Sequence, residues 1–165
     1  MFIGALGLSP QQYGMLAVFT VAGFLAGSLL AGRLTGRLAL DHLAMLGLLI
    51  AAAGALATLA LAALAMPSVL AVVAPMAVFT AGLGIVLPAG MAAAMVPFPR
   101  IAGSASALLG FVQMLVAAVA SAAVGVLPHR SALPMAAVIA ACTVFALLGF
   151  IILVRPLRRP DPQAG

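Results

Sequence analysis

The sequence predicts an all-α membrane protein with five transmembrane helices. Of its 165 residues, 67% are hydrophobic and 5% are charged, and the mean hydropathy is +1.38, far outside the composition of water-soluble domains. A helix satisfies its own backbone hydrogen bonds, so about 20 consecutive apolar residues can cross the hydrocarbon core of a bilayer. The chain therefore divides into five predicted spans, at approximately 12–32, 42–65, 69–96, 103–127 and 132–154.

The segments between these spans carry the residues that end helices. They contain "RLTGRLALD", "MPS", "PFPRIA" and "PHRS", each with a proline, a glycine or a charge. Asp41 is expected to cap the second helix at its N-terminus. After the fifth span, residues 155–165 hold prolines and charges, which predicts a short cytoplasmic tail.

The arginines predict the orientation of the helices. With five spans, one side of the membrane receives Arg33, Arg37, Arg100, Arg155, Arg158 and Arg159, and the other receives Arg130 alone. Cytoplasmic loops carry the excess of basic residues, so the N-terminus is expected outside and the C-terminus in the cytoplasm. No basic face is predicted on which a phosphate backbone could lie, so nucleic acid is not an expected partner.

The N-terminal residues 1–11 are uncharged and begin already apolar. We interpret them as the outer end of a truncated preceding helix, followed by a turn at Ser9 and Pro10. On this interpretation the chain is part of a longer protein.

Three of the predicted spans have faces of small or polar residues, which in lipid tend to face other helices or a cavity. The clearest, in the fourth span, has helical spacing and consists of Ser106, Gly110, Gln113, Ala117 and Ser121. The first span places Thr20, Gly23, Gly27 and Ala31 on one face. The third carries Thr80, Pro88 and several glycines, and Pro88 predicts a kink or local unwinding. The second and fifth spans have few such residues and are expected to be peripheral.

Catalysis is not indicated by any residue pattern. The chain lacks paired carboxylates, a serine–histidine–acid set, a metal cluster and a phosphate loop, and Cys142 is its single cysteine. No metal or cofactor is therefore expected. The predicted spans also hold no Asp, Glu, Lys or Arg at central depth, where proton relays and ion sites usually need one.

Two stretches carry a resemblance to a known family. "GLSPQQYGMLAVFTVAGFLAGSLLAGRL" (7–34) and "PFPRIAGSASALLGFVQM" (97–114) resemble the C-terminal half of bicyclomycin-resistance (Bcr/CflA) type drug transporters of the major facilitator superfamily. Such transporters have twelve helices in two halves. The resemblance implies that this chain supplies the eighth to twelfth helices in a bacterial inner membrane, with the missing N-terminal half as its partner.

The resemblance also implies a function, namely proton-coupled export of small amphipathic compounds by alternating access, with this chain inactive alone. The residues that it assigns to the cavity lining are Gln113, Ser106, Gly110, Thr20, Thr80, Pro88 and Met91. It assigns Gly27, Arg33 and Arg37 to a cytoplasmic loop motif, whose acidic member is replaced by Gly32. Alternatively, Gln113 bonds a neighbouring helix, and the two arginines only determine topology.

A second class of function fits the same composition. A stand-alone five-span protein that acts as an interaction or assembly subunit would also be rich in small residues, but it must explain the uncharged, outside N-terminus as a natural start. A channel would need a pore ring or a water-lined path, for which five helices with so few polar groups supply little.

Overall fold

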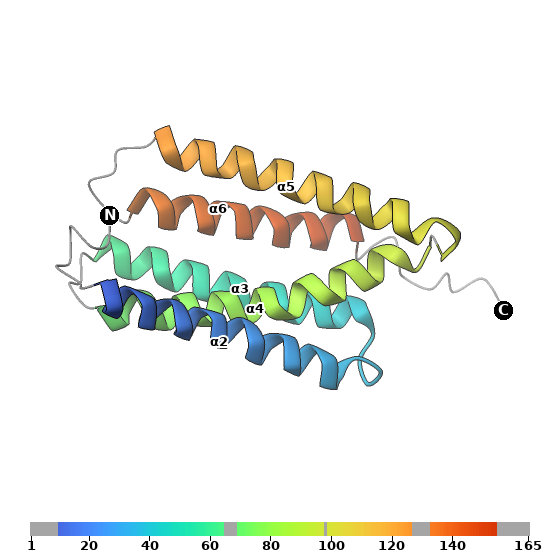
Figure 1. Ribbon diagram of the computed structural model, residues 1–165, viewed down its shortest axis with the longest axis horizontal. Coiled ribbons are helices and arrows are strands. Elements are labelled where there is room, and N and C mark those ends of the chain that lie inside the picture. Colours follow the sequence, from blue (N-terminus) through green and yellow to red (C-terminus); the bar gives the residue numbers. More distant parts are fainter. Residues whose placement is uncertain (1–9, 65–68, 98, 127–132, 155–165) are drawn as a thin grey trace.

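The computed structural model describes residues 10–64, 69–97, 99–126 and 133–154. These residues are almost entirely helical (Figure 1). In chain order the elements are α2 (Pro10–Leu34), α3 (Leu40–Ala63), α4 (Val69–Met95), the 3-10 turn η1 (Pro99–Ile101), α5 (Ala102–Val126), α6 (Leu133–Gly149) and the π-helical turn η2 (Phe150–Val154).

The helices are built for a membrane. Within the described residues, α3, α4, α5 and α6 each contain a stretch long and apolar enough to cross a bilayer, and α2 adds the shorter apolar run Val18–Leu34. Each helix begins and ends within about two residues of the corresponding predicted range. The protein is therefore an all-α, membrane-embedded chain. Residues 1–9 and the predicted tail 155–165 lie outside the described residues.

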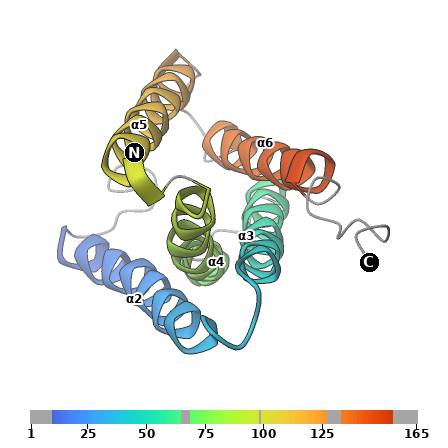
Figure 2. The same ribbon diagram turned by 90° about the vertical axis from the view of Figure 1, so that its right-hand side faces the viewer.

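α4 lies between α2 and α3 and packs closely against both (Figure 2). The buried core consists of small and medium apolar side chains from these three helices: Ala31, Leu43, Ala44, Ile85 and Ala89. Small side chains dominate because lipid provides little hydrophobic driving force between helices, so close van der Waals packing must hold them together.

Glycines set the distance between these three helices. A Cβ on Gly27 would overlap the carbonyl oxygen of Ala81 in α4, and a Cβ on Gly84 would overlap that of Phe24 in α2. On the other side of α4, a Cβ on Gly82 would overlap the backbone of Ala51 in α3. Larger residues at these positions would push the backbones apart, so the sequence itself fixes the separation.

The expected division into interior and peripheral helices is wrong for two of the helices. α3, predicted to be peripheral, is the most deeply embedded, with half the residues of its most apolar window buried, whereas α5, with the clearest polar face, has none buried. The physical reason is that α3 carries a face of alanines and glycines, including Gly47, Ala51 and Gly54, which packs well without any polar group.

Two local expectations also need correction. Asp41 does not occupy the N-cap, which is Ala39; the carboxylate lies in the first turn of α3, where negative charge still complements the helix dipole. α4 does not unwind at Pro88 and continues as one helix through both Pro75 and Pro88. The α2–α3 turn contains Gly36 with φ +95, a conformation that favours glycine.

We expect the Gly27→Ala substitution to destabilise the bundle by about 1–3 kcal/mol, because the added methyl group overpacks the α2–α4 contact. The matched control is Gly110→Ala in α5, whose Cβ would meet nothing within 4 Å and which should gain up to about 1 kcal/mol from helix propensity. Unfolding by SDS titration in mixed micelles measures both. Equal effects of the two substitutions would contradict the packing described.

Candidate binding cavity

The residues predicted to line a cavity are not brought together into one site. Thr20 and Thr80 lie in the contact between α2 and α4, where the Thr80 hydroxyl lies 2.8 Å from the Thr20 carbonyl oxygen and 3.1 Å from that of Ala77. Both threonines are half-buried. Their polar groups therefore join two helices in this structure.

Three other predicted residues lie along α5. Ser106 and Gly110 are half-buried, and the Ser106 hydroxyl donates to the Gly103 carbonyl oxygen at 2.9 Å. Gln113 lies near the middle of the helix and is exposed. No hydrogen bond joins its side-chain amide to any other residue that the structure describes. An unpaired amide at this depth in hydrocarbon is costly, so Gln113 needs a partner beyond the described helices.

The remaining predicted lining residues lie toward the C-terminal end of α4. Pro88 and Met91 are both exposed, and the intervening Ala89 is buried against the core. They lie on a different helix from Gln113, and α4 has only sparse contact with α5. The set Gln113, Pro88 and Met91 thus outlines an open surface.

The proposed loop motif divides into two environments. Gly27 is buried in the α2–α4 contact and acts as a packing residue. Arg33, in the last turn of α2, and Arg37, in the α2–α3 turn, are exposed at one end of the bundle. Neither arginine forms an ion pair with another described residue, and both positions fit a role in topology or in contact with another unit.

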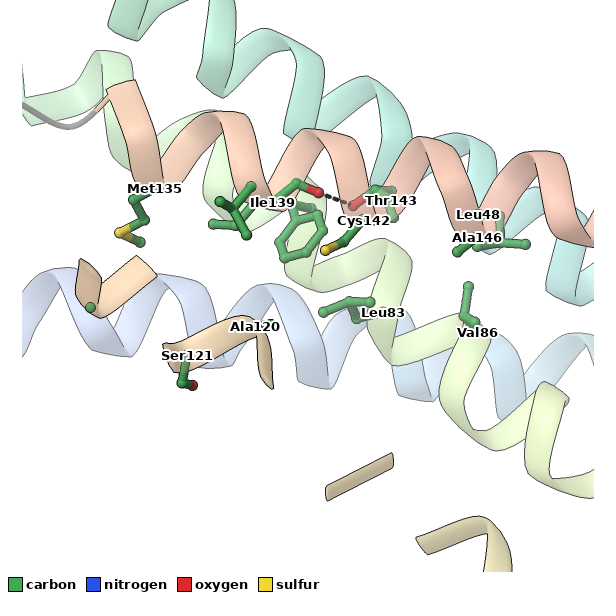
Figure 3. Close-up of a pocket in the computed structure, with 14 residues that line it drawn as sticks. Leu48, Leu83, Val86, Ala120, Ser121, Met135, Ile139, Cys142, Thr143 and Ala146 are labelled. Carbon is green, nitrogen blue, oxygen red and sulfur yellow. Dashed lines mark hydrogen bonds between the residues drawn. The ribbon is translucent and has the colours of Figure 1, made fainter. Parts of the chain in front are cut away.

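A cavity does exist, at a place that the sequence did not indicate. It has a volume of about 730 Å³ and lies between α3, α4, α5 and α6 (Figure 3). We call it the α5–α6 groove. Its α5 wall includes Ala120 and Ser121, its α6 wall includes Met135 and Cys142, and its floor includes Leu83 of α4 and Leu48 of α3.

The groove is lined almost entirely by apolar side chains. No Asp, Glu, Lys, Arg or His lines it. The Thr143 hydroxyl at its edge donates to the Ile139 carbonyl oxygen at 2.7 Å and is thereby satisfied. Such a surface can hold an apolar molecule or helix but offers no group for acid–base chemistry. The residues that could hold a metal ion do not gather into any cluster within the described part of the chain.

Sequence analysis missed the groove because it looked for polar stripes. Ser121 was the single groove residue on the predicted polar face of α5, and the α6 wall holds apolar side chains with only Cys142 and Thr143 as weakly polar groups. A signal was nevertheless present, since Ala120, Ser121 and Gly125 in α5 form a run of small residues at helical spacing.

Comparison with known proteins identifies no relative. No family model matches the chain, and no curated protein or solved structure is significantly similar to it.

We expect Thr80→Val to lower the free energy of unfolding by about 0.6 kcal/mol, the average for a hydrogen bond between helices in a membrane. Valine keeps the shape of threonine but removes the hydroxyl that joins α4 to α2. Thr58→Val is the matched control, because the buried Thr58 hydroxyl bonds only within its own helix, to the Gly54 carbonyl oxygen at 2.8 Å. SDS titration should show a smaller loss for Thr58→Val, and a larger one would contradict the role assigned to Thr80.

Proposed function

We propose that this chain is the C-terminal part of a proton-coupled efflux transporter of the Bcr/CflA type, which exports small amphipathic compounds by alternating access. The proposal is supported first by the resemblance of 7–34 and 97–114 to that family. These stretches contribute to α2, which packs on α4, and to η1 and α5, which carry the open polar face.

The observation that carries the proposal is the exposed face of α5. A helix with no buried residue and an unpaired Gln113 at its middle must face another unit or a water-filled path. In a two-half transporter that unit is the opposing half, and substrate binds near the middle of the membrane between the two. Gln113 then offers a donor and an acceptor to the substrate, while Met91 gives an adaptable apolar contact.

The other elements have structural roles in this scheme. α2, α3 and α4 are packed through glycine contacts and move as one rigid body when the two halves rock. Arg33 and Arg37 lie at the end of the bundle that faces the cytoplasm, in a bacterial inner membrane with the N-terminus outside. No described residue at depth titrates usefully, so proton coupling requires carboxylates from the missing N-terminal half.

A second candidate function is a stand-alone five-span subunit that binds another membrane protein. The same face of α5 favours it, because Gly103, Ser106 and Gly110 permit close approach of a helix and Gln113 can bond across the contact. The two functions differ in whether the complete polypeptide moves a substrate.

We expect the 165-residue chain, expressed alone in a drug-sensitive bacterium, to confer no resistance, because half of the cavity and the opposing half of the rocking pair are missing. The full-length polypeptide should lower the accumulation of an amphipathic dye, and a protonophore should abolish that export. Resistance from the 165-residue chain alone, or a full-length protein that exports no compound of a broad panel, would refute the proposal.

In the full-length protein, we expect Gln113→Ala to change the relative resistance to different compounds without lowering the protein level, because it removes a hydrogen-bonding group from the cavity. The matched control is Leu115→Ala, an exposed residue two positions away on the bulky face of α5. Resistance profiles across a compound panel, with immunoblots for expression, measure both. A profile unchanged by Gln113→Ala would assign Gln113 to helix packing.

A further inference from the structure

α5 and α6 face one another across the α5–α6 groove, yet the contact between them is sparse. Ala120 and Ser121 form one wall and Ile139 and Cys142 the other, and α5 contributes no buried residue to the bundle. Helices in lipid associate through close packing and hydrogen bonds. The described contacts supply little of either to α5, so the groove needs an occupant.

The rest of the bundle shows what kind of occupant fits. α2 and α3 are consecutive antiparallel helices, and α4 lies between them in close contact with both (Figure 2). α5 and α6 are also consecutive antiparallel helices that splay apart, and between them lies the groove. The groove therefore occupies, for the second pair, the place that α4 fills for the first.

The residues along α5 agree with a missing neighbour. In the packed part of the bundle, Gly23, Gly27 and Gly84 each lie against the backbone of another helix. In α5, a Cβ on Gly110 or on Gly125 would meet nothing within 4 Å. Gly125 lines the groove itself, so a close helix contact is available there that no described element uses.

We propose that the α5–α6 groove seats one further transmembrane helix, and that this helix is the one that precedes Pro10 in the same polypeptide, with Met1–Leu8 as its last residues. The inference rests on the proposed function in treating the chain as part of a longer protein. α4, the helix that precedes the α5–α6 pair, packs between α2 and α3. The helix that precedes the α2–α3 pair is its counterpart, and it packs between α5 and α6.

Position and chemistry both favour this segment. α2 begins at the end of the bundle where α5 ends and α6 begins (Figure 1), which is where Met135 lines the groove. A helix that ends just before Pro10 would therefore end beside the groove. The sequence Met1–Leu8, "MFIGALGL", is uncharged and apolar, and so suits a groove without charged lining residues. Its remaining turns would lie N-terminal to Met1 in the full-length protein.

Cys142 provides a natural reporter, because its exposed thiol lines the groove. A nitroxide on Cys142 in liposomes reports collisions with dissolved oxygen, which is concentrated in lipid. The matched control places the nitroxide on Ala137→Cys in a Cys142→Ala background, since Ala137 is exposed on α6 but does not line the groove. Both labels are measured in the 165-residue chain and in the full-length polypeptide, whose other cysteines are replaced.

We expect a several-fold loss of oxygen accessibility at position 142 in the full-length protein relative to the 165-residue chain, with no change at position 137. Unchanged accessibility at 142 would overturn the proposal, as would a complete reading frame that begins at Met1. Protection of 142 already in the 165-residue chain, growing with the protein-to-lipid ratio, would overturn it in favour of a second copy.

The result separates this inference from the proposed function. A full-length protein that protects position 142 but exports no compound would keep the helix in the groove and remove the efflux function. A protein that exports compounds while position 142 remains accessible to oxygen would keep the function and refute the helix.

Discussion

The close approach of α4 to α2 and α3 is the constraint on which the rest of the structure depends. In lipid, burying apolar surface gives little reason for one helix to choose another, so the choice is made by surfaces that fit at short range. Gly27 and Gly84 remove the side chains that would separate α2 from α4, and Gly82 does the same toward α3. The three-helix unit is therefore specified by what these positions lack, and its rigidity follows from backbone contact that larger residues would prevent.

The same rule explains why α5 stands apart. Its glycines and serines could support equally close contact, but the described helices offer no surface that reaches them. The unpaired amide of Gln113 increases the cost of leaving this helix in lipid. The half-open arrangement on the α5–α6 side and the closed arrangement on the α2–α3 side thus belong to one packing scheme, in which the first part is complete and the second lacks a member. A transporter whose two halves meet over α5 and a subunit that docks through α5 would both use this face.

Much of the fold could be predicted from the sequence, because apolar runs of helical length and the prolines, glycines and arginines between them mark membrane helices directly. The ends of all described helices follow from these signals. The arrangement of the helices could not be predicted in the same way. Polar residues were expected to mark the interior, but Thr58 in α3 and Thr143 in α6 satisfy their hydroxyls on their own helices, and the deepest contacts use alanine and glycine. Since these residues occur throughout the chain, only the three-dimensional pairing distinguishes a packed glycine such as Gly82 from an open one such as Gly110.

The most direct test of this account is a pair of spin-label distance measurements in the Cys142→Ala chain in liposomes. One pair of labels, at Leu49 of α3 and Val78 of α4, spans the packed side, and the other, at Val116 of α5 and Leu148 of α6, spans the groove; all four residues are exposed. In the 165-residue chain, the account predicts a narrow distance distribution for the first pair and a broad one for the second, with the second becoming narrow in the full-length protein. Equally narrow distributions for both pairs in the 165-residue chain would contradict it.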